Sequence, residues 1–517
     1  MTRHVVATLA AVGLAVALGT GSTGDCVPAG TSALWKNFVQ ARKNGSEPIL
    51  PDFSHAGYHY SAAPIPDIAG PIFRVTDYGA VADDNRHDDE AIQKAIDAAA
   101  TAGGGVVLFP SGRFLVSPTD KVDQLITITS SRIVLRGAGS GDGGTDIVMD
   151  KMKAGGVMFR IAPNDMTSNA LTTITADARR ETFEIQVADP SVLTIGRRVV
   201  IRYQDPAYNK IYFGDLELSP AWKRVYDSGM SFAEVHRVAA ISGKRVRFEE
   251  PLHFTLVMNT APFTLRSLTF LEEVGIEDIR FSGKWDEYPE AFVHHKDTYH
   301  DTAWSILGIK QVANSWIRRA EFRNVNQAIN ADTAVAFTFD RIRYTGKQGH
   351  TSIHARRGYG VLMKDNEDLA AFDHGPSVGY NAAGTVILRH KLQVAQQIDS
   401  HGGVPYATLL DDVTGGIFED NGGPYENYPN HAKHMVFWNF AHRAKKDHVY
   451  DFWSVAKREN NTFALPIFAG FTHDRAVVFT DEKRKVAYNE SPGARVTPPS
   501  LFDAQLALRS CMATKDK

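Results

Sequence analysis

Histidines are concentrated between residues 349 and 440, together with arginines, lysines and aspartates on short β-type runs and glycine-rich turns. The candidate catalytic residues are His354, Lys364, His374, Arg389, Asp399 and His401. The candidate substrate-binding residues are Trp222, His350, Arg356, Lys391 and Tyr406. Imidazole and ammonium groups can take a proton from carbon, and cationic groups can neutralise a carboxylate. This set of groups therefore suits proton abstraction from a carbon atom next to a carboxylate.

The Asp399-Ser-His401 segment is the most specific feature of this region. Its two polar side chains are two residues apart, so on a strand they lie on the same face. An aspartate can orient the imidazole, and the following Gly402 and Gly403 allow a ligand to approach closely. His374 has a similar setting. The alternative is that these side chains hold turns through hydrogen bonds to the backbone.

Hydrolysis is the competing chemistry, and it needs two cooperating carboxylates. Asp411 and Asp412 are adjacent, so on a strand they point to opposite faces and need a partner such as Asp399. No HExxH-type spacing indicates zinc, and a histidine-rich zinc site is a lesser alternative. The sequence identifies no certain cofactor. Ca²⁺ remains open, although the aspartates at 83–89 lack EF-hand spacing and are expected to cap a helix and hold a turn.

The composition is that of a folded globular protein. The 517 residues are 43% hydrophobic and 22% charged, with a formal net charge of −3. This near-neutral charge argues against a nucleic-acid partner, which usually needs a basic face. Basic groups can still gather locally for an acidic polysaccharide. The oligomeric state is left open.

Residues 1–25 are predicted to be a secretory signal peptide. Arg3 and His4 precede an apolar run over residues 5–18, which is short for a membrane span and ends in small residues. We expect secretion to the periplasm or the extracellular space, with no membrane contact after removal of the signal; a single N-terminal anchor is the alternative. Cys26 and Cys511 are expected to form a disulfide, or otherwise to remain two thiols at the chain ends.

Residues 26–72 are predicted to form an arm with a helix near residues 34–42 and a proline-rich extended part, which either covers an end of the main body or lines one side of a cleft. Residues 73–116 follow with a strand, an Asp-rich turn, a helix and two strands. Their pattern, DYGA…DD…AIQKAIDAA…GGGVVLFPSGRFLV, resembles the entry segment of the pectate-lyase-like right-handed parallel β-helix superfamily. The resemblance implies an all-β solenoid whose N-terminal end is capped by the helix. It bears on the fold more than on the function.

The remaining chain is organised around the expected solenoid of residues 73–480, with a closing segment over 481–517. Residues 174–255 are predicted to form a small antiparallel β insertion. Its aromatic loop either offers sugar-stacking platforms or packs on itself; these aromatic residues are Tyr208, Tyr212, Phe213 and Trp222. The loop at 284–304 carries His294, His295 and His300 near the expected wall, where solvation is the simpler reading of each.

Residues 383–390, AGTVILRH, resemble the Arg-His strand of the β-helical alginate lyase and chondroitinase B family, although its Lys-Ser context is absent. The resemblance implies that Arg389 assists the acid side and that Lys364, one coil earlier, is the base. Asp373-His-Gly375 partly matches polygalacturonase-like hydrolases, but their Asn-Thr-Asp strand is missing. The leading hypothesis is a secreted lyase that cleaves a uronic-acid-containing polysaccharide by β-elimination. A glycoside hydrolase and a non-catalytic carbohydrate-binding β-helix are the alternatives.

Overall fold

The computed structural model describes residues 27–116, 124–151, 155–419, 421–423, 427–454 and 462–515. The expected signal peptide and Cys26, with its expected bond to Cys511, lie outside these ranges. Within them, no helix is long and apolar enough to cross a membrane. The described chain is mostly β, with helices at its ends and in its loops.

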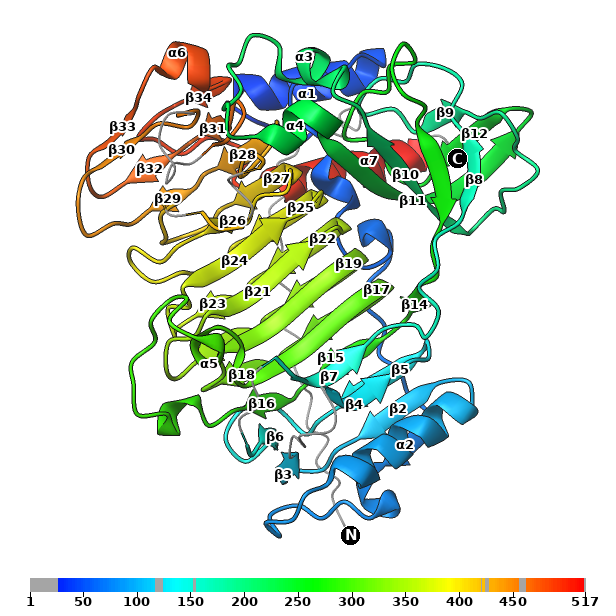
Figure 1. Cartoon of the computed structure of the whole chain (residues 1–517), viewed down its shortest axis with the longest axis vertical. Helices are drawn as coiled ribbons and strands as arrows, with labels where there is room; N and C mark the ends of the chain where they lie inside the picture. Colours follow the sequence, from blue (N-terminus) through cyan, green and yellow to red (C-terminus); the bar gives the residue numbers. More distant parts are fainter. Residues whose placement is uncertain are drawn as a thin grey trace, which may run out of the picture.

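Successive coils stack their strands in parallel into three ladders, which form three faces of a β-helix (Figure 1). The first face contains β4 (Gln124–Ile128), β7 (Val157–Ile161), the first halves of β17 (Ser305–Arg318) and β19 (Gln327–Asp340), β21 (Thr351–Arg356), β24 (His374–Gly379) and β26 (Asp399–Ser400). The third face contains β3 (Gly112–Val116), β6 (Thr145–Met149), β16 (Arg280–Ser282), β18 (Glu321–Arg323), β20 (Arg343–Thr345) and β23 (Glu367–Asp368).

The second face is the longest of the three. It contains β1 (Ile72–Arg74), β2 (Gly105–Leu108), β5 (Ile133–Arg136), β15 (Gly275–Glu277), the second halves of β17 and β19, β22 (Tyr359–Lys364), β25 (Ala383–Leu388), β27 (Tyr406–Asp411), β28 (Met435–Trp438), β31 (Ile467–Ala469) and β34 (Tyr488–Glu490). The short β14 (Leu271–Glu272) pairs with the middle of β17. Two small sheets complete the C-terminal coils, one of β29 (Ala441–His442) and β32 (Thr472–His473), the other of β30 (His448–Tyr450) and β33 (Val477–Phe479).

Apolar side chains from all three faces fill the interior of the solenoid. Ile353 and Val361 come from one coil, Ile387 and Leu410 from the next two, and all four are buried in one cluster. Because neighbouring residues on a strand point to opposite sides, the residues between them point outward. On the first face those outward residues are polar, whereas on the second they are largely apolar. We call the polar outer side of the first face the chemical wall. The outer side of the second face is a surface on which other segments pack.

The helix α2 (Asp89–Thr101) packs over β1, β2, β4 and β5 at the N-terminal end, the lower end in Figure 1. Its buried side is formed by Ala91, Ile92, Ala95, Ile96 and Ala99. The expected capping by Asp88 is not made by its side chain, which instead accepts hydrogen bonds from the backbone of Val81 at 3.0 Å and Leu115 at 3.3 Å. The short η3 (Val75–Tyr78) connects β1 to this turn. The acidic turn therefore ties the cap to the third face.

Three segments cover the second face. The first is the N-terminal arm with α1 (Ala33–Asn44), η1 (Phe53–His55) and η2 (Tyr58–Ser61). The second is an antiparallel sheet of β8 (Ala170–Thr173), β9 (Glu184–Gln186), β10 (Arg198–Gln204), β11 (Ser231–Ser242), β12 (Arg245–Phe248) and β13 (Thr264–Ser267), which extends beyond the expected limits of 174–255 on both sides. The third is the C-terminal α7 (Leu501–Lys515). Their apolar residues and those of the second face form one buried cluster.

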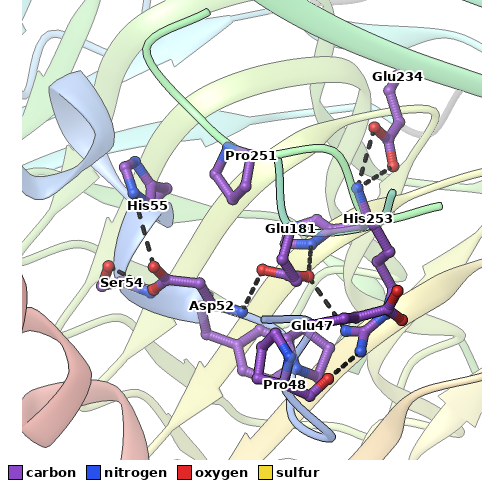
Figure 2. A network of polar contacts seen from close by, with 12 residues as sticks. Glu47, Pro48, Asp52, Ser54, His55, Glu181, Glu234, Pro251 and His253 are labelled. Carbon is purple, nitrogen blue, oxygen red and sulfur yellow. Dashed lines mark hydrogen bonds and ion pairs between the residues drawn. The ribbon is translucent and has the colours of Figure 1, made fainter. Parts of the chain in front are cut away.

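A buried polar network joins the arm to the antiparallel sheet (Figure 2). Glu181 is its centre: it accepts a hydrogen bond from the backbone of Asp52 at 2.9 Å, and it contacts His253 Nδ1 at 3.0 Å and Arg180 at 3.2 Å. Arg180 also reaches Glu47 of the arm at 3.0 Å. The arm is therefore held by charged contacts as well as by apolar packing.

The aromatic loop of the insertion packs on itself. It contains α3 (Tyr208–Phe213) and α4 (Lys223–Ser228). Trp222 is only 2% exposed, and its ring centroid lies 5.4 Å from that of Trp453. Tyr208, Tyr212 and Phe213 are also buried. Of the two alternatives for this loop, the structure shows the one in which its aromatic rings pack on themselves. The expectation that Trp222 binds substrate is therefore corrected, because other rings cover it.

The start of the described N-terminal arm lies against the C-terminal coils. Glu490 of β34 accepts hydrogen bonds from Ser32 at 2.7 Å and from the backbone of Ala33, at the start of α1. The short α6 (Glu482–Lys485) precedes β34. The loop between β16 and β17 carries η4 (Trp285–Glu287) and α5 (Thr298–Thr302) and returns to the first face. That loop brings further polar side chains to the chemical wall.

Candidate functional site

The first face carries an outward column of polar residues on consecutive coils. In the register of the parallel strands, His354 of β21 is level with Ser377 of β24, and Ser377 is level with Asp399 of β26. In the next column, Arg356 is level with Gly379. Neighbouring strands are about 4.8 Å apart, so side chains from different coils meet here. Backbone register alone therefore gathers residues that are far apart in the sequence.

Asp399 is the buried anchor of this column. Its carboxylate accepts hydrogen bonds from His401 Nδ1 at 2.7 Å, from Ser377 Oγ at 2.9 Å and from the Gly422 backbone at 2.9 Å. His374 Nδ1 lies 3.3 Å from the same carboxylate. Burial on its own would raise the pKa of Asp399, but the two imidazoles and the hydrogen bonds outweigh it and hold the pKa well below its usual range. Asp399 is therefore an anion that orients both rings.

His401 presents the more accessible of these two rings. Its side chain is 23% exposed, and Nδ1 is occupied by Asp399, so Nε2 is the atom available for proton transfer. Burial lowers the pKa of an imidazole, yet the charge and hydrogen bond of Asp399 outweigh this and raise the pKa of His401 above its ordinary value. The spacing in the sequence predicted this contact, and the structure contains it.

The other histidines of the wall are held neutral. Burial lowers the pKa of His350 and of His374 to about 4, and it lowers the pKa of His354 well below its ordinary value. The rings of His354 and His401 meet edge to face, with centroids 4.9 Å apart. At neutral pH the wall thus combines uncharged imidazoles with one more basic ring.

Glycines make room for these rings. A Cβ at Gly379 would lie 2.9 Å from His354 Nε2 and 3.2 Å from His401 Cβ. A Cβ at Gly422 would lie 2.7 Å from His401 Nδ1. Any larger residue would push the imidazoles from their positions, because real Cβ atoms do not come this close. The glycines are part of the site for this steric reason.

Arginines and a tyrosine lie beside the imidazoles. The guanidinium carbons of Arg356 and Arg357 lie 5.6 and 4.6 Å from the ring centroid of Tyr380. Asp332 pairs with Arg357 at 2.7 Å and lies 3.7 Å from Arg356. Arg356 points to the same side of β21 as His354. It can therefore bind a carboxylate that lies along the wall. Tyr380 was missed in the sequence; its position directly after Gly379 was the available signal.

A second group of histidines adjoins the first. His294 Nε2 lies 3.1 Å from His374 Nε2, and the rings of His294 and His350 have centroids 5.3 Å apart. The ring of His295 lies next to that of His294, tilted by 30°, with ring centroids 3.8 Å apart. The sequence predicted that this loop lies near the wall, with His294 and His295 either solvated or part of the site, and both are exposed. The structure places them against the wall, because the loop from β16 to β17 folds back over it.

Three predicted residues lie away from the histidines. Lys364 ends β22 and Arg389 follows β25, so both lie on the second face; Arg389 pairs with Asp365 at 2.7 Å and with Asp503 of α7 at 2.8 Å. Lys391 is exposed and bridges to the third ladder. The chain bends between β21 and β22, where Arg357 has φ 56°. The expected union of Lys364 and Arg389 with His401 is therefore corrected, since the bend separates them.

Two further expectations change for reasons of burial and pairing. Tyr406 is 0% exposed and packs against Phe232 of the antiparallel sheet, so it has no surface to offer a sugar. Asp411 accepts hydrogen bonds from Ser500 at 2.7 Å and from the first residues of α7, and burial raises its pKa to about 7. Asp412 pairs with Arg495 at 2.7 Å. Both carboxylates hold the C-terminal segment instead of facing the wall.

The two hollows described next do not coincide with the polar residues of the first face. A hollow of about 670 Å³ lies near the C-terminal coils and is lined by Phe213, Glu217, Trp453 and Lys485, among others. Another, of about 510 Å³, is lined by Arg132, Arg198 and Glu272, among others. Neither has a histidine in its lining. The first face suits an extended polymer better than either hollow, because such a ligand needs a long wall of polar groups more than a deep pocket.

Two family models match parts of the chain. Residues 72–192 match the model described as "Rhamnogalacturonase A/epimerase, pectate lyase-like", and residues 371–514 match a domain of unknown function, DUF4955. The second match contains most of the histidine wall. It assigns no activity to it.

The curated relatives match only part of this chain, and the solved structures match it at low sequence identity. Mannuronan C5-epimerase AlgE3 of Azotobacter vinelandii is 27% identical over 267 residues, which are 48% of this chain and 14% of the epimerase. Alginate lyase 7 of the same organism is 44% identical over 70 residues, 14% of this chain and 8% of the lyase. The solved A-module of mannuronan C-5 epimerase AlgE6 from Azotobacter vinelandii covers 83% of this chain and 96% of the module at 12% identity, with a TM-score of 0.38.

The chain thus spans a small part of the length of these curated relatives. The match over residues 72–192 coincides with the cap and first coils of a solenoid whose strands run parallel on three faces. This match and the parallel strands of the solenoid fit the pectate-lyase-like parallel β-helix superfamily.

Proposed function

We propose that this protein is a secreted lyase that cleaves a uronic-acid-containing polysaccharide by β-elimination. The observation that carries the proposal is the hydrogen bond between Asp399 and His401, with Arg356 on the same face of the solenoid. The names of the relatives, an alginate lyase and mannuronan C5-epimerases, support a uronate polymer as the substrate class.

The reaction needs a base and a group that neutralises the uronate. Arg356 binds the carboxylate of the sugar, which makes the proton on C5 more acidic. His401 Nε2 accepts that proton while Asp399 holds Nδ1. The electron pair forms the C4–C5 double bond, the C4–O bond breaks, and the leaving oxygen takes up a proton from water. The lyase thus yields an unsaturated sugar at the new end.

A C5-epimerase is the second candidate, and the names of the relatives favour it. The first step is the same, because the C5 proton must also leave. The proton then returns from the opposite side of the ring, and the C4–O bond stays intact. Hydrolysis has less support, since Asp399 is buried and occupied by three hydrogen bonds and Asp411 caps α7.

The test uses the full chain on a panel of uronate polymers. Ultraviolet absorbance detects the conjugated double bond, and proton NMR in D₂O detects exchange and inversion at C5. With the unaltered protein we expect the absorbance to rise. With His401→Gln we expect the rate of this rise to be about 100- to 10,000-fold lower. Arg356→Gln is expected to lose activity as well. Arg389→Gln is the matched control, because its side chain is 36% exposed against 35% for Arg356 but lies on the second face.

The products separate the candidates. Inversion at C5 without an increase in ultraviolet absorbance would show that the protein is an epimerase, not a lyase, with the same site. New reducing ends without absorbance or C5 exchange would indicate a hydrolase and contradict the role of His401. Equal losses for Arg356→Gln and Arg389→Gln would contradict the placement of the site on the first face.

A further inference from the structure

Four histidines beside the wall share one arrangement of their ring nitrogens. In each of them Nδ1 faces an oxygen: His294 lies 3.7 Å from Asp373, His295 lies 3.1 Å from the Asp301 carboxylate, His350 lies 2.9 Å from the Asp301 carbonyl, and His374 lies 3.3 Å from Asp399. An oxygen that only accepts hydrogen bonds places the proton on Nδ1. The lone pair of the His295 and His350 rings is then on Nε2, and the longer contacts of His294 and His374 with carboxylates favour the same arrangement. Metal-binding histidines in proteins usually have this second contact.

The Nε2 atoms of His294 and His374 lie 3.1 Å apart. If each ring carries its proton on Nδ1, two lone pairs face one another at this distance and repel. A cation between them removes the repulsion. Tetrahedral zinc with Zn–N bonds of about 2.0–2.1 Å places neighbouring nitrogens about 3.3–3.4 Å apart, close to the observed separation.

His350 provides independent support. It is buried, and among the described residues no polar atom forms a hydrogen bond with its Nε2. Leaving a buried ring nitrogen without a partner is unfavourable, so such an atom indicates a missing ligand. One ligand atom from each of His294, His295 and His350 lies within 4.8 Å of the other two, and His294, Asp373 and His374 meet the same limit. These are two separate groups that share His294, so a single ion bound by all four histidines draws the loop of His294 and His295 toward His374. The ring centroids of His350 and His374 are 4.9 Å apart.

We propose that His294, His295, His350 and His374 bind one divalent transition-metal ion, for which Zn²⁺ is the probe. Imidazole ligands suit zinc and its neighbours in the first transition row, whereas Ca²⁺ prefers a shell of oxygens. Asp301, Asp373 and Asp399 orient the rings from behind. Two ligands come from the loop after β16 and two from the first face, so the ion also fastens this loop to the wall.

The site goes beyond the proposed reaction and can be tested separately from it, although Asp399 contacts a ring in each of the two sites. Its four rings do not include His401, whose Nδ1 is taken by Asp399. The binding of metal can therefore be measured without polysaccharide. His401→Gln is expected to keep the metal while it loses activity, so failure of one proposal is distinguishable from failure of the other.

The experiment is calorimetric titration of Zn²⁺ into untagged full-length protein that has been freed of metal with a chelator. We expect one ion per chain, and at least about 100-fold weaker binding by the double variant His294→Asn/His295→Asn. These two positions lie on an exposed loop, so the variant should fold, which circular dichroism checks. Asp301→Asn should weaken binding by about 10- to 100-fold. His473→Asn is the control, because His473 is exposed on β32 far along the chain from the site.

Cobalt provides a second measurement. Co²⁺ bound by nitrogen ligands has visible absorption bands, which should appear with the unaltered protein and not with the double variant. Absence of stoichiometric Zn²⁺ binding would overturn the proposal, and the contact between His294 and His374 would then be an ordinary N–H···N hydrogen bond. Equal affinities of the double variant and His473→Asn, or binding of Ca²⁺ in preference to Zn²⁺, would overturn it too.

Discussion

Asp399 Oδ2 lies 2.7 Å from His401 Nδ1, and the same oxygen lies 3.3 Å from His374 Nδ1. One buried carboxylate thus orients two imidazoles that have different surroundings. The His401 ring is partly exposed on the chemical wall, while His374 turns its other nitrogen toward His294. Asp399 therefore connects the proposed proton-transfer site with the proposed metal site.

Asp399→Asn tests the orientation of His401. The amide can donate to Nδ1, which leaves the proton on Nε2 and removes its capacity to accept one. We expect kcat to fall by about 100- to 10,000-fold, with a smaller change in KM, in steady-state assays on the uronate polymer. Ser377→Ala is the control: it removes one donor to Asp399 but leaves the contact with His401. An active Asp399→Asn variant would contradict the role of the pair.

Gly379→Ala tests the packing of the rings. The new Cβ would meet His354 Nε2 at 2.9 Å and His401 Cβ at 3.2 Å, so the rings must shift. We expect most of the activity to be lost while the melting temperature changes little, because His401 is at the surface and can move. Gly308→Ala is the matched control on the same face, since its Cβ would meet only ordinary contacts from 3.5 Å. Similar activities of the two variants would refute the steric role.

Glu181→Ala tests how the N-terminal arm is held. The substitution removes the carboxylate that contacts Arg180 and His253, and both of these side chains stay buried without it. It also leaves the backbone N–H of Asp52 without its acceptor. We expect the free energy of unfolding to fall by about 3–5 kcal/mol in denaturant titrations. Glu184→Ala is the control, because Glu184 is exposed on β9 and its ion pair with Arg247 should contribute at most about 1 kcal/mol. A loss of less than about 1 kcal/mol for Glu181→Ala would contradict a stabilising role of the network in Figure 2.

His236 gives a prediction for the effect of pH on stability. It is buried between Glu234 at 2.9 Å and Glu250 at 3.1 Å, with Tyr359 packed against its ring. Burial lowers the pKa of His236, but the two carboxylates outweigh it and raise the pKa to about 9. The folded protein thus keeps a proton that the unfolded chain releases above about pH 6.5.

The stabilisation from His236 is complete below about pH 6.5 and is lost as the pH rises through about 9. Its size is up to about 3 kcal/mol, at roughly 1.4 kcal/mol for each unit of pKa difference. Unfolding free energies measured across this range should decline, and His236→Gln should flatten the decline. An unchanged slope in the variant would mean that another group causes it.

The local part of the site followed from the sequence. Asp399 and His401 had to share a face because strand residues alternate, and α2 was expected from the spacing of Ala91, Ile92 and Ala95. The pairing of Lys364 and Arg389 with the histidines was wrong for a reason that spacing does not carry. The bend after Arg356 turns each coil onto a second face, and its angle depends on packing around the whole coil.

The sequence by itself predicted the parallel β-helix and its N-terminal cap through the family resemblance of residues 73–116, and it predicted a histidine-rich wall from a dense cluster of residue types. The tertiary structure decided which of those residues meet. It buried Tyr406 and Trp222 under the antiparallel sheet and the aromatic loop, and it brought His294 and His295 back to the wall from the loop after β16. Contacts between coils and insertions depend on strand register and on the path of loops. These are set by burial of the whole surface and leave no local signal in the chain.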